Sequence, residues 1–181
     1  MAGLASEEFA LRAGELQWIL CDVDGVLTDG GLYYDRRGHG MLRFAVRDGL
    51  GLTLAQRAGL HVGVLSGRAS AALDHRGKEL GFDAMMTGIR DKGAALSAFL
   101  EERGLSARQV AFIGDDLPDL MPLARCGLSF APADAAAEVR TVVHQVLEAP
   151  GGRGAVREMI EAILQARGAW DEVFRSFTFD R

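Results

Sequence analysis

Two aspartates after an apolar run are the residues of this sequence best placed to do chemistry. Asp22 and Asp24 follow the apolar run 18–20 and precede the turn-forming Gly25. Side chains two residues apart on a strand point the same way, so both carboxyl groups would share one face. Two carboxylates this close destabilise each other unless a cation lies between them or one holds a proton. The pair therefore indicates a metal site, an acid–base pair, or both.

Three later segments carry groups suited to phosphate or to a metal ion. The Ser-Gly-Arg turn 66–68 offers a hydroxyl and free backbone N–H groups, which suit an anion. Lys92 opens a predicted helix, where a lysine gains nothing from the helix dipole, so anion binding would explain its position. The segment 114–119 follows an apolar run and contains three acids of the type that Mg²⁺ prefers: Asp115, Asp116 and Asp119.

The elements that must position these groups alternate along the chain. Apolar runs predict strands at 18–23, 61–65, 110–113 and 128–130. Apolar residues at three- to four-residue spacing predict helices at 4–15, 50–58, 70–80, 92–103 and 119–125, with Gly59, Gly81, Gly104 and Gly127 as stops. This pattern predicts an α/β fold, a Rossmann-like parallel sheet with helices on both faces. Ligands bind at the carboxyl ends of such strands, where the reactive segments fall.

Residues 31–48 break the alternation and are interpreted as a projecting β-hairpin with a glycine-containing turn. Only 43 residues separate Asp22 from Ser66 and 25 separate Ser66 from Lys92, which leaves no room for a cap domain. We therefore expect a single domain over 1–181, with a C-terminal tail at about 150–181. Its site would be open in a monomer, which favours a homo-oligomer with the hairpin at an interface.

Composition limits the partners. A chain of 181 residues that is 49% hydrophobic suits one domain with a substantial core, and a net charge of −5 argues against nucleic acid or membrane and for a small molecule. No apolar stretch reaches the ~20 residues needed to span a bilayer, and a signal-peptide pattern is lacking, so we expect a cytoplasmic protein. Cys21 and Cys126 are expected to be reduced core residues. The histidines show no metal-binding spacing: His39, His61, His75 and His144.

The order of these segments resembles the four motifs of the haloacid dehalogenase-like phosphohydrolases: DVDGVLTDG at 22–30, SGR at 66–68, Lys92, and GDDLPD at 114–119. VRDG at 46–49 and GGRGAVRE at 151–158 further resemble the cap-less branch that acts on 3-deoxy-D-manno-octulosonate 8-phosphate. The resemblance covers nearly the whole chain. It implies a magnesium-dependent phosphatase of lipopolysaccharide precursor synthesis. It also implies a homotetramer whose hairpins meet centrally and whose C-terminal tail helps to close a neighbour's site.

The resemblance also implies roles for the acids. Asp22 would be the nucleophile that forms an aspartyl-phosphate, and Asp24 would act as general acid and then as general base. Magnesium would be held by Asp22, the backbone carbonyl of Asp24, and Asp115. Asp116 and Asp119 would tune the ion from nearby.

Substrate contacts are implied in the same way. Ser66, Gly67 and Lys92 would bind the phosphoryl group. A guanidinium group matches a carboxylate bidentately, so four residues are candidates for the sugar-acid carboxylate: Arg47, Arg68, Arg153 and Arg157.

Simpler structural roles compete with several of these assignments. Ser66 could be a helix N-cap, Lys92 a solvated helix residue, and Asp116 and Asp119 first-turn acids. The glycines of 151–154 could form a linker before a final amphipathic helix. Three closing aromatic residues would pack either on a partner subunit or in the core: Phe174, Phe177 and Phe179.

The chain also departs from the family pattern. Residues 39–43 replace an acidic and lysine-containing strand, and Ser66 stands where threonine is frequent. The hairpin change bears on the substrate, so a phosphatase for a nine-carbon sugar acid 9-phosphate or another small phosphate ester remains an alternative. A non-catalytic oligomerisation module is an alternative of another class, although it would not need to keep these acids and Lys92 together.

Overall fold

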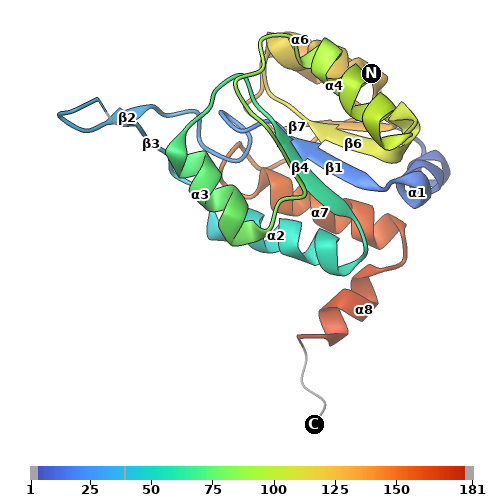
Figure 1. The fold of residues 1–181 in the computed structure, drawn as a ribbon. Helices are drawn as coiled ribbons and strands as arrows, with labels where there is room; N and C mark the ends of the chain where they lie inside the picture. The colour runs from blue at the N-terminus through green and yellow to red at the C-terminus, as the bar shows by residue number, and fades with distance from the viewer. Residues whose placement is uncertain (1–3, 39, 178–181) are drawn as a thin grey trace.

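A six-stranded parallel sheet forms the centre of the computed structural model, which describes residues 4–38 and 40–177 (Figure 1). Its strands are β1 (Trp18–Cys21), β4 (His61–Leu65), β5 (Ala84–Met86), β6 (Val110–Ile113), β7 (Leu128–Ala131) and β8 (Gln145–Val146). They lie in the order β5-β4-β1-β6-β7-β8. The chain runs from β1 outward to β5, then crosses to the other side of β1 and runs outward to β8. The switch in direction therefore lies at β1, where ligands bind in such sheets.

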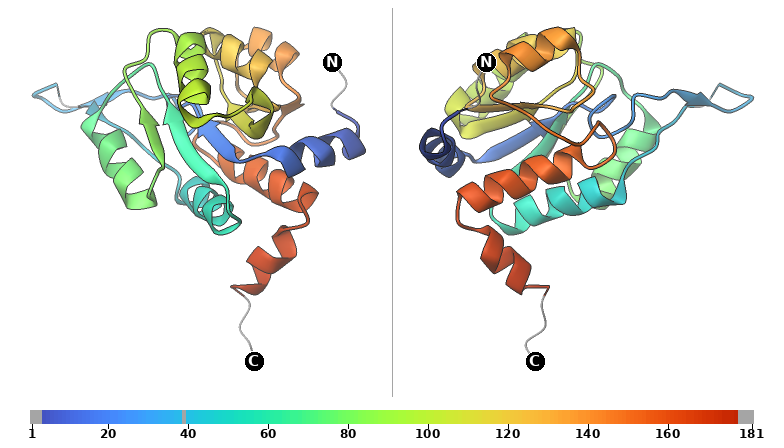
Figure 2. Two further views of the ribbon diagram at one scale, coloured as in Figure 1. Left: turned by 45° about the vertical axis from the view of Figure 1, so that its right-hand side comes forward. Right: turned by 180° about the vertical axis from the view of Figure 1, so that it is seen from behind.

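Helices cover both faces of the sheet (Figures 1 and 2). One layer contains α1 (Ser6–Glu15), α2 (Val46–Arg57), α3 (Ala71–Leu80) and α7 (Ala155–Ala166), and the other contains α4 (Lys92–Arg103), α5 (Leu120–Arg125) and α6 (Ala137–Val142). A last helix, α8 (Trp170–Arg175), follows α7. The predicted α/β fold is thereby confirmed, and the described residues contain no cap domain. None of the helices found in this part of the chain is both long and apolar enough to cross a membrane.

The two hydrophobic cores follow from alternation along the strands. In β1, Ile19 and Cys21 face the α2–α7 layer, whereas Trp18 and Leu20 face the α4–α6 layer. Side chains of a strand point alternately to opposite faces, so a continuous apolar run fills both cores. Cys21 and Cys126 are buried free thiols, as predicted.

Some predicted boundaries were wrong. The hairpin is shorter than 31–48: it pairs β2 (Tyr33–Tyr34) with β3 (Gly40–Met41), and residues 46–48 form the first turn of α2. Strands β5 and β8 were not predicted. Gly81 and Gly104 end α3 and α4 in the left-handed conformation, as expected, whereas α5 ends on extended backbone at Cys126. Within the segment predicted as a tail, α7 is largely buried.

Candidate active site

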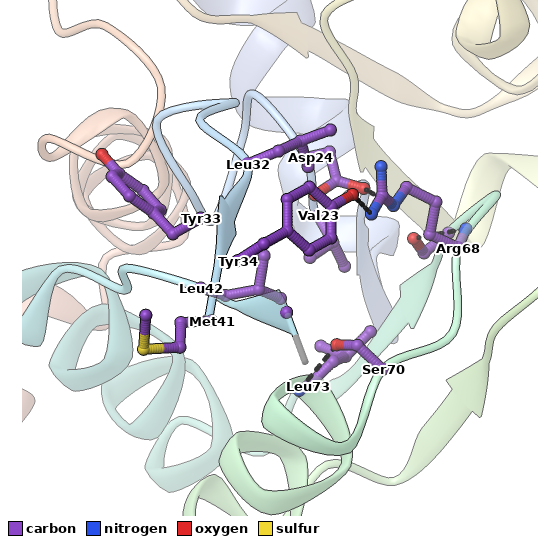
Figure 3. Close-up of a pocket in the computed structure, with 12 residues that line it drawn as sticks. Val23, Asp24, Leu32, Tyr33, Tyr34, Met41, Leu42, Arg68, Ser70 and Leu73 are labelled. Atoms are coloured by element: carbon purple, nitrogen blue, oxygen red, sulfur yellow. Dashed lines mark hydrogen bonds and ion pairs between the residues drawn. The ribbon is translucent and has the colours of Figure 1, made fainter. Parts of the chain in front are cut away.

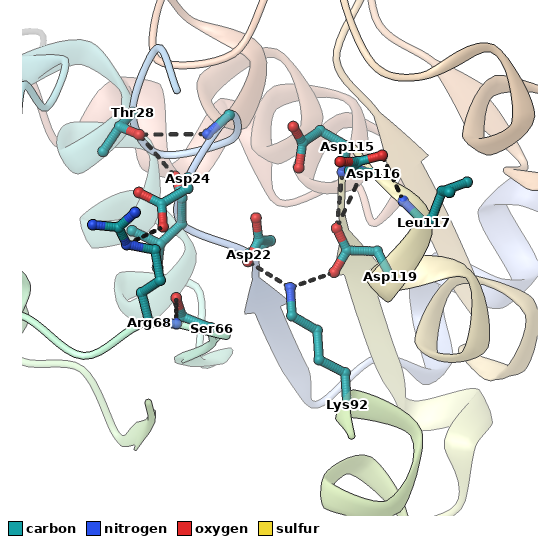
Figure 4. Close-up of polar contacts among 12 residues, drawn as sticks. Asp22, Asp24, Thr28, Ser66, Arg68, Lys92, Asp115, Asp116, Leu117 and Asp119 are labelled. Carbon is teal, nitrogen blue, oxygen red and sulfur yellow. Dashed lines mark hydrogen bonds and ion pairs between the residues drawn. The ribbon is translucent and has the colours of Figure 1, made fainter. Parts of the chain in front are cut away.

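Three neighbouring strands bring the predicted reactive residues together. Asp22 follows β1, Ser66 follows β4 and Asp115 follows β6 after one glycine, and β1 pairs in parallel with both neighbours. Their carboxyl ends therefore meet at one edge of the sheet, where Figure 4 shows the side chains gathered around Asp22. The expected convergence of the three strand ends is confirmed.

Lys92 lies at the centre of this group. Its Nζ donates to Asp22 Oδ1 and to Asp119 Oδ1, each at 2.6 Å, and the residue is only 5% exposed (Figure 4). The first turn of α4 is capped instead by Asp91, whose side chain accepts from Ala94 N. The alternative of a solvated helix lysine was wrong, because the fold places this cation between two buried carboxylates.

Three carboxylates form a cluster that suits a divalent cation. Asp22, Asp115 and Asp119 each offer an oxygen, and these atoms all lie within 4.8 Å of one another. Burial and the charge of Asp119 raise the pKa of Asp22 to about 6, although the Lys92 ammonium lowers it. Burial and the charges of Asp22 and Asp119 raise the pKa of Asp115 to about 8. One lysine does not balance the negative charge of three carboxylates, so the cluster favours a further cation. Mg²⁺ prefers hard oxygen donors, and these residues therefore fit that ion.

Asp119 shapes the turn that carries Asp115. Its Oδ2 accepts from the backbone N–H of Asp115 (3.1 Å) and of Asp116 (3.4 Å), while Oδ1 takes Lys92. A Cβ at Gly114 would lie 2.5 Å from Asp119 Cβ, so only glycine fits beneath it. Asp119 therefore does more than complement a helix dipole. Asp116 is exposed and caps the short 3-10 turn Leu117–Asp119 by accepting from Leu117 N at 2.8 Å.

Asp24 lies on the other side of Asp22, next to Arg68. Arg68 Nε is 3.6 Å from Asp24 Oδ2, and Arg68 Nη2 donates to the Tyr34 hydroxyl at 3.4 Å. Ser66 is buried and its Oγ accepts from Arg68 N, while Ser70 caps α3, so the N-cap alternative for Ser66 was wrong.

A pocket lies between the hairpin and the 66–68 turn, beside Asp24 (Figure 3). Tyr34 points across it toward Arg68, whereas Tyr33 points away. Its wall combines apolar side chains with the polar groups of Asp24, Ser66 and Arg68. Its volume is only about 30 Å³, so a larger ligand would have to extend out of it over the neighbouring surface.

The four candidate arginines are not all brought to the site. Of the four, Arg68 contacts Asp24, the acid that lies beside the carboxylate cluster. Arg47 and Arg153 are exposed. Arg157 pairs with Glu161 on the next turn of α7 and stacks 5.8 Å from the centre of the Trp170 ring. Its guanidinium group is therefore already engaged along α7.

Two residues that support the loops around the site were missed by sequence reasoning. Thr28 is buried and donates to Val23 O, and it accepts from the N–H groups of Gly25 and Gly30, so it braces the loop after β1. Asp48 is 1% exposed and binds the start of α7. Both residues lie in segments that resemble family motifs. A polar residue inside such a motif was the signal that could have identified them.

The remaining predictions concern histidines and phenylalanines. His61 stacks on Trp18, and His144 contacts Ser129 and Arg12. Phe174 and Phe177 are exposed rather than packed in the core. His39 and Phe179 lie outside the described residues.

Comparisons with known proteins agree with this geometry. Residues 82–159 match the family model of haloacid dehalogenase-like hydrolases. The 3-deoxy-D-manno-octulosonate 8-phosphate phosphatase of Haemophilus influenzae is 46% identical over 153 residues, which cover 84% of this chain and 85% of that protein. The crystal structure of the Moraxella catarrhalis phosphatase of the same name, in complex with magnesium, phosphate and the sugar acid, superposes with a TM-score of 0.92. It is 35% identical, and the match covers 94% of this chain and 98% of that one. A cobalt-bound form of the Haemophilus influenzae phosphatase gives a TM-score of 0.84 at 43% identity, covering 94% of this chain and 96% of that one.

Proposed function

The chain belongs to the 3-deoxy-D-manno-octulosonate 8-phosphate phosphatases of the haloacid dehalogenase-like hydrolases, and from this we propose that it hydrolyses that substrate to the free sugar acid and phosphate. The reaction belongs to lipopolysaccharide precursor synthesis. The observation that carries the proposal is the buried Asp22 carboxylate held by Lys92 at the end of the central strand. The nearest alternative substrates are a nine-carbon sugar acid 9-phosphate and other small phosphate esters.

Asp22 acts as the nucleophile. Its pKa of about 6, raised mainly by burial and by Asp119, leaves the carboxylate largely ionised at neutral pH. The Lys92 contact fixes one oxygen, Oδ1, and orients the carboxylate. Attack on phosphorus forms the aspartyl-phosphate and breaks the bond to the sugar oxygen, which divides hydrolysis into two easier steps.

Asp24 transfers the protons. In the first step it donates a proton to the leaving sugar oxygen, and in the second it takes one from the water that attacks the aspartyl-phosphate. Arg68, 3.6 Å away, holds the Asp24 carboxylate toward the pocket. The second step releases phosphate and restores Asp22.

Magnesium fits the oxygen donors of this cluster. Asp22, Asp115 and the backbone carbonyl of Asp24 would hold the ion, because both oxygens of Asp119 already accept hydrogen bonds. Asp119 and Asp116 then shape the turn around Asp115. When bound, the ion neutralises charge between the phosphoryl group and Asp22.

Ser66, Gly67 and Lys92 bind the phosphoryl oxygens. The expectation of several free N–H groups in the 66–68 turn was wrong, because Ser66 N donates to Met86 O and Arg68 N to Ser66 Oγ. The Ser66 hydroxyl and the Gly67 N–H supply the hydrogen bonds, and the Lys92 ammonium supplies charge where it develops in the transition state. Among the arginines, Arg68 is the best candidate for the sugar-acid carboxylate, because it borders the pocket. Arg47 and Arg153 are exposed and are candidates for contacts with a neighbouring subunit's substrate.

The active form is a homotetramer with the hairpin at its centre, in the cytoplasm, and each chain is a single domain. Apolar side chains are exposed on the hairpin, at 48% for Leu32, 47% for Tyr33 and 56% for Met41, which supports burial by a neighbour. Sedimentation of the active protein tests the assembly. A stable and fully active monomer would contradict it.

Phosphate release from a panel of esters tests the proposed reaction. The panel contains the eight-carbon sugar acid 8-phosphate, a nine-carbon 9-phosphate and common sugar phosphates, each with and without magnesium. We expect strong, magnesium-dependent preference for the eight-carbon acid. Equal or better turnover of another ester would overturn the substrate assignment.

A further inference from the structure

The glycine-rich turn 151–154 packs backbone to backbone against the loop that follows β1. A Cβ at Gly151 would lie 1.8 Å from Gly25 O, and one at Gly152 would lie 2.3 Å from the Thr28 carbonyl carbon. Gly152 N also donates to Val26 O at 2.8 Å. Such approach leaves no room for any side chain. The alternative of a simple linker at 151–154 was therefore wrong.

Gly25 contacts the acidic cluster on its other side. A Cβ at Gly25 would lie 2.0 Å from Asp115 Oδ2, and its φ of +87° is one that glycine adopts without strain. The Gly25 backbone is thus packed between Gly151 and the Asp115 carboxylate. The peptide bond before Gly25 also carries the Asp24 carbonyl, a proposed magnesium ligand.

Asp48 holds the turn in place through hydrogen bonds to the start of α7. Its Oδ2 accepts from Gly154 N at 3.1 Å and its Oδ1 from Arg157 N at 2.9 Å, so it caps α7 from the first turn of α2. A carboxylate at a helix N-terminus is stabilised by the helix dipole as well as by these bonds. Asp134 adds a further bond by accepting from Gly151 N at 2.9 Å.

We propose that Asp48 and the turn 151–154 are positioning elements for the magnesium site, acting through the Gly25 backbone. Asp48 holds the turn, the turn sets the position of Gly25, and Gly25 sets both the Asp24 carbonyl and the wall against which Asp115 packs. Apart from Arg153, the candidate for contact with a neighbouring subunit's substrate, none of these residues touches the substrate in this scheme. The proposal rests on the proposed function only for the identity of the ion.

Two variants test it. Asp48→Asn keeps the shape of the side chain but presents an amide N–H to one of the two helix N–H groups. Gly151→Ala adds the Cβ that clashes with Gly25 O. The control, Gly59→Ala, lies beyond the opposite end of α2 from Asp48. There φ is +82° and a Cβ would meet nothing within 4 Å, so it strains the backbone without touching the turn.

Two readouts are made without substrate: the magnesium Kd by titration calorimetry, and hydrogen exchange of residues 22–30. Both test variants should weaken magnesium binding by about tenfold or more, as supporting residues around metal sites do, and should speed exchange of that segment. Gly59→Ala should leave both unchanged even where it lowers thermal stability. If Gly151→Ala does not fold, Asp48→Asn alone decides.

The proposal is overturned if Asp48→Asn leaves both readouts at their original values, or if Gly59→Ala changes them as much. Failure of the proposed function has a different signature. In that case the unsubstituted protein binds no magnesium, while exchange of residues 22–30 still responds to Asp48→Asn and not to Gly59→Ala.

Discussion

Lys92 Nζ lies 2.6 Å from Asp22 Oδ1 although the two residues are 70 positions apart in sequence, and both side chains are almost fully buried. The contact joins the start of α4, which lies in one of the helical layers, to the end of β1 in the central sheet. A buried cation at this distance lowers the pKa of the Asp22 carboxyl group and orients it, so the same contact would serve both folding and the proposed nucleophile.

Removal of Lys92 should therefore affect both. Lys92→Met leaves Asp22 and Asp119 buried without their cation, which should destabilise the metal-free protein by about 3–5 kcal/mol. Protonation of Asp22 should reduce this loss of stability. Turnover should fall by about 10²–10³-fold, since a charge at the phosphoryl group is lost. Chemical denaturation and phosphate release measure the two effects.

The other lysine of the chain supplies the control. Lys78 is exposed on α3. Lys78→Met should leave stability and turnover nearly unchanged. Wild-type turnover in Lys92→Met would show that the buried ion pair is structural only.

Asp24→Asn should lower kcat according to the leaving group. A sugar alkoxide needs a proton as it departs, so kcat for the sugar phosphate should fall by about 10²–10⁴-fold. The first step with p-nitrophenyl phosphate needs no such proton and should be affected much less. Burst kinetics with both esters separate formation of the aspartyl-phosphate from its hydrolysis. Equal loss of the first step for both esters would exclude Asp24 as the general acid.

Arg68→Lys should raise KM for the carboxylated substrate by about tenfold or more, because lysine cannot form the bidentate pair. KM for p-nitrophenyl phosphate, which has no carboxylate, should change little. Arg157→Lys is the matched control, because Arg157 is engaged by Glu161 and Trp170. A larger increase in KM for Arg157→Lys than for Arg68→Lys would show that the sugar-acid carboxylate was assigned to the wrong arginine.

His144 should make stability depend on pH. Arg12 Nη1 lies 3.0 Å from His144 Nε2 and Ser129 N lies 3.0 Å from Nδ1, so both ring nitrogens face N–H donors and a second proton on the ring is disfavoured. Burial and then the Arg12 charge lower the pKa of His144, against a smaller opposite effect of Glu8. The unfolded chain therefore binds the proton first, so stability from this group is present above about pH 6.5 and is lost as pH falls through the folded pKa.

Thermal unfolding between about pH 7.5 and about pH 5 measures this dependence. His144→Gln removes the titrating group, and its melting temperature should fall less steeply with decreasing pH. His75→Gln, at an exposed position on α3, should keep the original slope. The same slope in all three proteins would exclude His144 as the cause.

Local patterns predicted the strands and helices with strong apolar periodicity, and α4 was predicted at its observed bounds. Strand β5 reads Ala-Met-Met and lacks the β-branched residues that identify strands, and β8 has only two residues. The start of α2 was missed because Asp48-Gly49 resembles a turn, whereas Asp48 is buried by its bonds to α7.

The site residues likewise include some that local patterns predict and some whose positions depend on tertiary packing. Asp22, Asp24 and Asp115 stand out because each follows a recognisable strand. The position of Lys92 between Asp22 and Asp119 depends on packing between distant segments, which no local pattern contains. The engagement of Arg157 by Glu161 and Trp170 is likewise a tertiary result.

The most direct test of the account is rapid acid quenching during turnover of 3-deoxy-D-manno-octulosonate 8-phosphate with magnesium, followed by mass spectrometry of the peptides. The account predicts that the peptide containing Asp22 gains the mass of one phosphoryl group, that fragmentation assigns it to Asp22, and that Asp22→Asn removes both the adduct and the turnover while the protein stays folded. A phosphoryl group on another residue, or undiminished turnover in Asp22→Asn, would contradict it.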